Sequence, residues 1–210
     1  MSKTYIQADI PPKPVPCKDL RFDSQYDGEV SLDALITHLR AHSVRTDGPF
    51  TLRSGKTSSW YIDARQTTFD GFGAALAGAA VLDVLSDEVE AVGGMTMGAD
   101  PISVATAVLA SQSGRPLRAF SIRKEEKDHG VGGRLVGPVT AGTNVAIIED
   151  TTTTGGAPIA AAETARAEGL NIIQAISVVD RSRGAAGAKF EAMDIPYVAL
   201  VKPADLGVGD

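Results

Sequence analysis

Apolar and polar positions follow two periods along the chain, one typical of helices and one typical of buried strands. The segment SLDALITHLRAHSV starts at Ser31, a favourable N-cap residue, and its leucine and isoleucine positions recur at helical spacing. TNVAIIED (143–150) and NIIQAISVVD (171–180) are nearly continuous apolar runs, as in strands that are covered on both faces. Because helical and strand segments alternate through most of the chain, we predict an α/β fold with a central, mainly parallel sheet flanked by helices.

Start and stop signals bound several of these elements. A helix of small residues is expected over roughly 69–86, and another helix has Pro101 near its first turn and Gly114 after its end. A third helix is closed by Gly169. The predicted strands between the helices cover residues 89–95, 117–122, 144–148, 171–181 and 197–203.

Composition is that of one globular domain. The chain has 210 residues, of which 43% are hydrophobic and 22% charged, enough apolar material for a full core. Cys17 is the only cysteine, so no intrachain disulfide can form, in keeping with a reducing compartment. We predict an N-terminal arm over 1–28, where PPKPVP cannot sustain a helix or a central strand, and one domain over 29–210.

Charge and hydropathy argue against two classes of partner. The net charge of -6 and the pI near 5.1 give no broad electrostatic footprint for nucleic acid. The N-terminus has no apolar signal-peptide core, and no apolar run is long enough to span a membrane. We therefore expect a cytoplasmic protein that binds neither nucleic acid nor membrane.

Two acids stand where a buried strand meets a loop of threonine and glycine. The strand at 144–148 delivers Glu149 and Asp150 to the carboxyl edge of the sheet, where ligands of parallel sheets bind. The loop at 151–157 leads into a helix N-terminus, whose N–H groups and dipole favour a phosphate, while the acids favour hydroxyl groups or a metal ion. A sugar 5-phosphate satisfies both preferences. An ordinary strand-to-helix turn with a solvated acid pair is the alternative.

The segment RKEEKDHGVGG (123–133) has neither a helical nor a strand period. It is polar, charged and rich in glycine, and a loop of this length inside a compact domain is usually functional or disordered. Its acids nearly balance its bases, so charge alone favours a solvated run of charges.

The histidines do not predict a metal site. His38 and His42 are four residues apart on the first predicted helix, but the only other histidine is His129 and no HExxH pattern occurs. A partly exposed helix face is the simpler interpretation.

Four segments together resemble one enzyme family. IIEDTTTTGG (147–156) resembles the phosphoribosyl diphosphate (PRPP) motif of type I phosphoribosyltransferases. FTLRSGKTSSWYIDAR (50–65) resembles the orotate-contacting segment of the orotate phosphoribosyltransferases, 123–133 resembles their mobile catalytic loop, and VVDR (178–181) resembles their second orotate-contacting site. The four segments occur in the family's order.

This resemblance implies a fold and a reaction. The fold would be that of the type I phosphoribosyltransferases, with a small hood subdomain beside the central sheet. The reaction would be the Mg²⁺-dependent transfer of the phosphoribosyl group of PRPP to orotate, which gives orotidine 5'-monophosphate and diphosphate in de novo pyrimidine (UMP) biosynthesis. The family's homodimer, in which the mobile loop of one subunit reaches the site of the other, is implied as well.

The resemblance also implies roles for individual residues. Glu149 and Asp150 would hold the ribose hydroxyls and contact Mg²⁺ indirectly, through ribose or water. The catalytic set would be Lys124, Lys127, His129 and Asp150. The PRPP-binding set would be Arg123, Lys124, Lys127, His129, Glu149, Asp150, Thr151, Thr152, Thr153, Thr154, Gly155, Gly156 and Ala157. The orotate-binding set would be Arg53, Tyr61, Thr153 and Arg181, with Arg181 facing the carboxylate.

Two positions depart from the family's pattern. Arg53 stands where many members have a lysine that reaches the diphosphate, and the loop GGMTMGADP (93–101) lacks the lysine that many members carry there. The same loop in the family often contains a cis peptide bond that does not involve proline, and the bond between Thr96 and Met97 is the candidate here.

Two other functions share part of this pattern. A purine phosphoribosyltransferase would have the EDTTTTGG loop without the segments at 50–65 and 123–133. A PRPP-sensing regulator would keep the ligand loop without catalysis, but it would typically add a nucleic-acid-binding surface, and the short arm shows no such signal.

Overall fold

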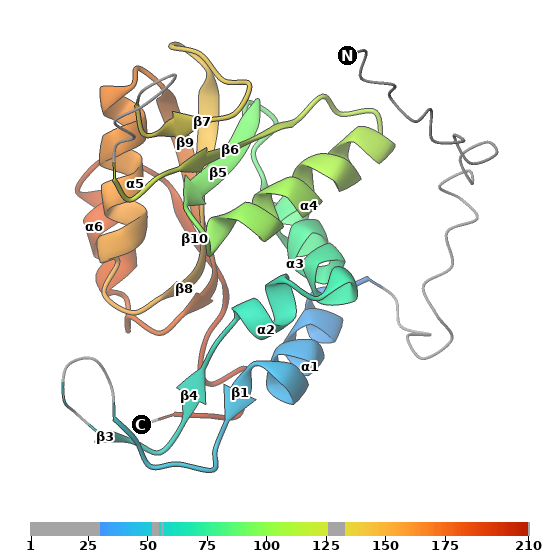
Figure 1. The fold of residues 1–210 in the computed structure, drawn as a ribbon, viewed down its shortest axis with the longest axis vertical. Helices are drawn as coiled ribbons and strands as arrows, with labels where there is room; N and C mark the ends of the chain where they lie inside the picture. The colour runs from blue at the N-terminus through green and yellow to red at the C-terminus, as the bar shows by residue number, and fades with distance from the viewer. Residues whose placement is uncertain (1–29, 52–54, 56, 126–132, 210) are drawn as a thin grey trace, which may run out of the picture.

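The computed structural model describes residues 30–51, 55, 57–125 and 133–209 (Figure 1). Within these ranges no helix is both long and apolar enough to cross a membrane. The elements are, in chain order, α1 (Leu32–His42), β1 (Val44–Arg45), β2 (Phe50–Thr51), β3 (Thr57–Ser58), β4 (Tyr61–Ile62), α2 (Arg65–Thr68), α3 (Gly71–Val84), β5 (Ala91–Met95), α4 (Ala99–Gln112), β6 (Arg118–Ile122), β7 (Leu135–Val136), β8 (Asn144–Thr152), α5 (Gly156–Ala167), β9 (Asn171–Asp180), α6 (Ala185–Glu191) and β10 (Tyr197–Val201).

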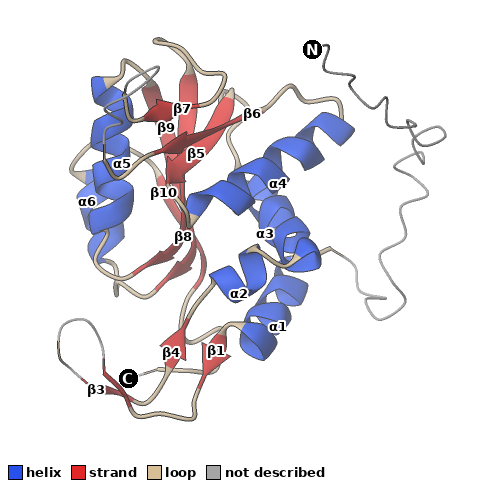
Figure 2. Ribbon diagram, viewed as in Figure 1, coloured by secondary structure: helices blue, strands red, loops and turns tan. Residues whose placement is uncertain are grey.

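Six strands form the central sheet, in the order β10-β9-β8-β5-β6-β7 (Figure 2). All neighbours pair in parallel except β6 and β7, which are antiparallel. The chain moves outward from β5 to β6 in one direction and from β8 to β9 and β10 in the other. The strand order therefore reverses between β5 and β8, and such a switch point opens a crevice at the carboxyl ends of the two strands. The predicted α/β fold with a mainly parallel sheet is confirmed.

Strand β8 is buried on both faces, as its apolar run predicts. Ala146 and Ile148 belong to the core cluster that also contains residues of α1, α3 and α4. Val145 and Ile147 belong to the opposite cluster, with residues of α5 and α6. The period of two along a strand thus supplies both cores from one segment. Figure 2 shows α3 and α4 on one side of the sheet and α5 and α6 on the other.

The hood subdomain lies at the carboxyl side of the sheet (Figure 1). It contains α1, α2 and two small antiparallel pairs, β1 with β4 and β2 with β3. As expected, Ser31 caps α1, because its hydroxyl accepts a hydrogen bond from the Ala34 amide at 3.2 Å. Arg40 of α1 donates to the backbone oxygen of Asp205 and so ties the C-terminal segment to the hood.

Several boundaries differ from the sequence prediction. The strand predicted over 144–148 continues to Thr152, because Thr151 and Thr152 still pair with Val179 and Asp180 of β9. The elements α2, α6 and β7 are short and lack the period that reveals longer elements. The predicted arm over 1–28 lies outside the described residues, so its boundary with a domain over 29–210 stays a prediction.

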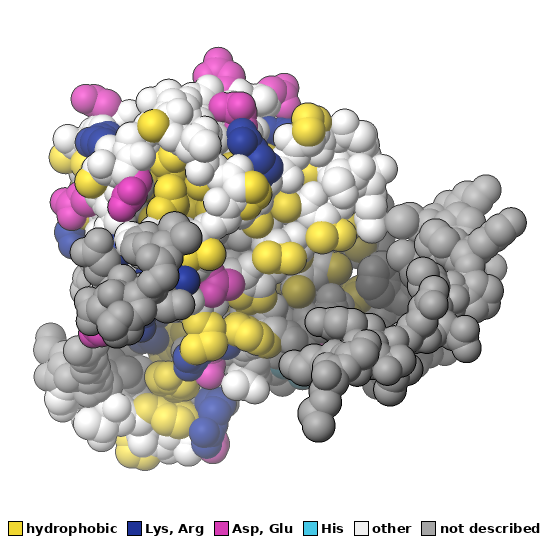
Figure 3. Space-filling view, turned by 45° about the horizontal axis from the view of Figure 1, so that its top comes forward, with side chains coloured by type: hydrophobic (Ala, Val, Ile, Leu, Met, Phe, Trp, Pro, Cys, Tyr) yellow, Lys and Arg dark blue, Asp and Glu magenta, His cyan; other side chains and the backbone are white. Residues whose placement is uncertain are grey.

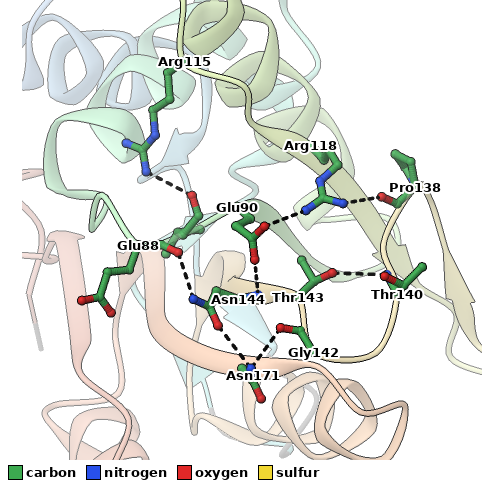
Figure 4. Close-up of polar contacts among 11 residues, drawn as sticks. Glu88, Glu90, Arg115, Arg118, Pro138, Thr140, Gly142, Thr143, Asn144 and Asn171 are labelled. Atoms are coloured by element: carbon green, nitrogen blue, oxygen red, sulfur yellow. Dashed lines mark hydrogen bonds and ion pairs between the residues drawn. The ribbon is translucent and has the colours of Figure 1, made fainter.

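A polar network fastens the strands at the amino edge of the sheet, opposite the carboxyl ends (Figure 4). The Glu90 carboxylate accepts from the Asn144 amide at 3.0 Å and pairs with Arg118 at 3.3 Å. Asn144 and Asn171 continue the network across β8 and β9 through a side-chain hydrogen bond of 3.2 Å. These contacts link the starts of adjacent strands and leave the carboxyl edge available for a site.

A buried glutamine makes a stronger tie between the sheet and α3. The Gln174 side chain accepts from the Ser86 amide at 3.0 Å and donates to the Val84 carbonyl oxygen at 2.9 Å, and the residue is buried. We expect Gln174→Ala to lower the free energy of unfolding by about 2 kcal/mol, because it leaves two backbone groups without their partner. Urea unfolding measures this change.

Glu90→Gln is the matched control, since an exposed ion pair contributes less than about 1 kcal/mol. Equal stabilities of the Gln174 and Glu90 variants would contradict the interpretation.

Candidate functional site

The predicted acids line a cavity at the switch point between β5 and β8. This acid-pair cavity has a volume of about 300 Å³, and residues from four segments meet in it. They come from the hood, from the end of β5, from the loop after β6 and from the end of β8 with the start of α5. The lining includes Tyr61, Asp63, Arg65, Met97, Gly98, Lys124, Glu149, Asp150, Thr151 and Ala157.

A glycine after β5 makes room for Asp150. A Cβ atom on Gly98 would lie 2.7 Å from an oxygen of the Asp150 carboxylate, so a larger residue would displace that side chain. Asp150 also accepts a hydrogen bond of 2.6 Å from the amide of Thr151. The peptide bond between Thr96 and Met97 is cis, as predicted.

Glu149 differs from its neighbour because it is buried. It is only 7% exposed, and its Oε2 atom is buried without a hydrogen-bond partner within the described part of the chain. Burial, followed by the hydrogen bond and negative charge of Asp150, raises the pKa of Glu149 to about 9, although Lys124 acts in the opposite direction. Glu149 therefore keeps its proton at neutral pH and can donate it.

The loop after β8 turns sharply into α5. Gly155 adopts a left-handed conformation (φ 77°), and a Cβ atom there would lie 3.0 Å from Cα of Ala186. Thr153 and Thr154 are exposed, and the Thr154 carbonyl accepts from the Lys189 ammonium at 2.5 Å. Gly156 begins the helix, so the amides of its first turn have no partners within the helix, and that of Gly156 donates to the Thr154 hydroxyl at 3.4 Å.

A second cavity of about 770 Å³ lies beside the first, and we call it the Arg181 cavity. It is lined by Thr153 and Arg181 together with Trp60, Asp180 and Tyr197. The Arg181 guanidinium lies 4.3 Å from the centre of the Trp60 ring, a cation–π contact.

A buried carboxylate orders the turn that carries Arg181. Asp180 accepts from the Ser182 amide at 2.6 Å and from the Tyr197 hydroxyl at 3.1 Å. Burial is the main cause that raises the pKa of Tyr197 above its usual range, so its hydroxyl keeps the proton that it donates.

The predicted orotate-binding set is divided between the two cavities. Thr153 and Arg181 line the Arg181 cavity, whereas Tyr61 lines the acid-pair cavity and Arg53 lies outside the described residues. The two neighbouring aromatic residues of this segment differ in burial. Trp60 is 3% exposed and belongs to the core, while Tyr61 is 38% exposed.

The predicted catalytic loop starts and ends at the sheet. The Arg123 amide donates to the Arg134 carbonyl at 2.8 Å, and the Arg134 side chain donates back to the Arg123 carbonyl at 2.9 Å. Lys124 reaches the acid-pair cavity. Lys127 and His129 lie outside the described residues, so their roles stay predictions.

His38 has a structural role. It is buried, its Nδ1 atom lies 3.2 Å from the Thr67 hydroxyl, and its Nε2 atom lies 3.3 Å from the Asp70 carboxylate. In the described ranges no three histidine, cysteine or acidic side chains gather as a metal cluster.

The structure adds two charged residues that the sequence did not single out. Asp63 and Arg65 line the acid-pair cavity from the hood. They stand immediately after the short β4 strand, inside the segment 50–65, and this position after a strand was the available signal.

Comparisons with known proteins agree on one family. No family model matches the chain. The orotate phosphoribosyltransferase of Streptomyces coelicolor is 40% identical over 162 residues, which cover 77% of this chain and 89% of that protein. The chain belongs to the orotate phosphoribosyltransferase family. A crystal structure of the Mycobacterium tuberculosis H37Rv orotate phosphoribosyltransferase has a TM-score of 0.74 at 33% identity, covering 84% of this chain and 99% of the other.

Another structure of the M. tuberculosis enzyme is a complex with PRPP. It has a TM-score of 0.69 at 31% identity and covers 84% of this chain and 99% of the other. The orotate phosphoribosyltransferase family and its type I phosphoribosyltransferase fold are thereby confirmed for this chain, which is a phosphoribosyltransferase enzyme.

The protonated state of Glu149 has a consequence for stability. Because its folded pKa lies above the unfolded value of 4.5, the folded state binds more protons between these values, and stability falls as pH rises from about 5 to 9. The Glu149→Gln side chain does not titrate, so this part of the fall in stability with pH is absent from the variant. We expect the stability difference between variant and parent to grow in favour of the variant by about 1 kcal/mol per pH unit. Urea unfolding at pH 5.5, 7.0 and 8.5 measures it, and parallel pH profiles would refute a buried neutral Glu149.

Proposed function

We propose that this family member catalyses the Mg²⁺-dependent transfer of the phosphoribosyl group from PRPP to orotate. The bond between the anomeric carbon and the diphosphate oxygen breaks, and the same carbon bonds to a ring nitrogen of orotate. Orotidine 5'-monophosphate and diphosphate are the products. This reaction would serve de novo pyrimidine (UMP) biosynthesis in the cytoplasm, with no nucleic-acid or membrane partner.

The observation that carries the proposal is the order of groups along the crevice. Gly155 and Gly156 open the N-terminus of α5, which favours the 5-phosphate. Glu149 and Asp150 come directly before this loop and would bind the two ribose hydroxyls. A protonated Glu149 both accepts and donates, which suits a hydroxyl partner.

The residues present fit a magnesium ion that binds largely through the substrate. Mg²⁺ is usually held by one or two carboxylates together with substrate phosphates and waters. Asp150 supplies such a carboxylate, and Glu149 beside it would contact the ion indirectly, through ribose or water. The ion would supply positive charge beside the diphosphate.

Catalysis by this chain would consist of positioning and charge stabilisation. Negative charge builds on the leaving diphosphate, so cations that face it stabilise the transition state. Lys124 lines the cavity, and Lys127 and His129 follow it in the loop that resembles the family's catalytic loop. Arg181, which contacts the Trp60 ring, would bind the carboxylate of orotate in the Arg181 cavity.

We propose a homodimer as the working state. Apolar side chains lie exposed beside the acid-pair cavity, with Phe69 at 58% and Met97 at 55% exposure lining one hollow. Val104 and Val108, one turn apart on α4, are also about half exposed. Figure 3 shows hydrophobic side chains gathered across the middle of one face of the molecule. A second copy of the chain would cover them.

A direct assay tests the reaction. We expect orotate absorbance to fall only when protein, PRPP and Mg²⁺ are all present, and Lys127→Ala to reduce the rate at least about 100-fold because it removes a cation facing the leaving group. Adenine, guanine and hypoxanthine are assayed in parallel. Turnover of a purine instead would favour a purine phosphoribosyltransferase, and PRPP binding without turnover of any base would favour a regulator.

Subunit mixing tests the shared site. Lys127→Ala and Asp150→Asn proteins are each expected to be nearly inactive. If the loop acts on the neighbouring subunit, mixing them restores up to about a quarter of the parental activity, because one site in four would combine both intact residues after random exchange of subunits. Absence of recovery after exchange has been verified by mass spectrometry would contradict a loop that acts in the partner's site.

A further inference from the structure

Arg65 is held by an ion pair at the rim of the acid-pair cavity. Its Nε atom donates to Oδ1 of Asp63 at 2.7 Å, and its Nη2 atom donates to Oδ2 at 3.2 Å. The Arg65 amide also donates to Oδ1 at 3.2 Å, and Gln66 donates to Oδ2 at 3.3 Å. The Asp63 side chain is 23% exposed, and the Arg65 hydrogen bond is the main cause that lowers the pKa of its carboxyl. The guanidinium is thus fixed in one orientation.

The free side of this guanidinium faces ligand space. Arg65 lines the acid-pair cavity and also the adjoining hollow that contains Phe69 and Met97. Asp63 occupies the edge formed by Nε and Nη2, and within the described part of the chain Nη1 donates no hydrogen bond. The side chain is 49% exposed, so Nη1 and the remaining proton of Nη2 are open to a ligand.

The charged side chains of the cavity lining suggest a binding role for Arg65. The described lining carries Arg65 and Lys124 as cations and Asp63, Glu149 and Asp150 as acids. A ligand with several phosphate charges is repelled by the acids and therefore needs the two cations to face it. Asp63 neutralises Arg65 only along one edge, which leaves a fork suited to phosphate oxygens.

The position of Arg65 selects one end of the ligand. The cavity is lined by Ala157 at the start of α5, by Glu149 and Asp150 at the end of β8, and by Met97 and Arg65 on the segments that follow β5 and β4. If the 5-phosphate lies at α5 and the ribose at the acids, the diphosphate points toward Met97 and Arg65. We propose that Arg65, oriented by Asp63, binds the diphosphate group of PRPP and stabilises it as it leaves. This inference rests on the proposed function and adds a residue to it.

The test separates the two ends of the ligand by binding affinity. Calorimetry with Mg²⁺ compares PRPP, inorganic diphosphate and ribose 5-phosphate on the parent protein and on Arg65→Gln. We expect affinity for PRPP and diphosphate to fall at least about tenfold, while ribose 5-phosphate changes less than about twofold. Arg65→Lys keeps the charge without the fork and should recover part of the loss.

Arg118→Gln is the matched control. Arg118 pairs with Glu90 much as Arg65 pairs with Asp63, but it lies at the amino edge of the sheet (Figure 4). It should leave all three affinities unchanged. Asp63→Asn should weaken diphosphate binding less than Arg65→Gln does, because the guanidinium remains but is no longer fixed.

The outcomes distinguish this inference from the proposed function. If Arg65→Gln binds diphosphate and PRPP as tightly as the parent protein does, the role of Arg65 is overturned and the proposed reaction still stands. Equal losses for all three ligands would overturn it too, because the effect would then be general. A parent protein that binds ribose 5-phosphate but not PRPP would overturn the proposed function, and this inference with it.

Discussion

The burial of β8 on both faces is the constraint on which the site depends. Val145 and Ile147 pack toward α5, while Ala146 and Ile148 pack toward α3 and α4, so the strand has no freedom to slip or rotate. Its parallel neighbours are β5 and β9. The strands that follow β5 extend the sheet on one side, and those that follow β9 extend it on the other. The end of β8 is therefore a rigid platform beside an open crevice, and Glu149 is placed there by the packing of apolar residues before it.

Rigidity of the strand makes an unfavourable arrangement of acids possible. Glu149 and Asp150 are adjacent in sequence, and burial would be costly if both were ionised. The raised pKa of Glu149 relieves this cost by keeping one proton on the pair. Gly98, which follows the neighbouring strand β5, leaves the space that the Asp150 side chain occupies. The end of β8 and the segment that follows β5 thus shape one acidic centre.

Ion pairs and ring contacts then orient the cations around this centre. Asp63 fixes Arg65 at one end of the acid-pair cavity, and Trp60 supports Arg181 in the cavity beside it. Both supports come from the short hood segment between β3 and α2, which therefore influences two neighbouring cavities. Asp63 occupies only one edge of the Arg65 guanidinium, so Arg65 retains donors for a ligand.

The sequence by itself determined the α/β class, the long helices and strands, and the acid pair with its glycine loop. These features depend on local periods and on residues adjacent in the chain, such as Glu149 to Gly156. The four ordered segments were enough to indicate the family. Only the tertiary structure decided that Tyr61 and Arg181 line different cavities, that Glu149 is buried, and that Asp63 and Arg65 face the acids. Those relations join residues far apart in the chain, so they depend on strand order and packing, which no local pattern contains.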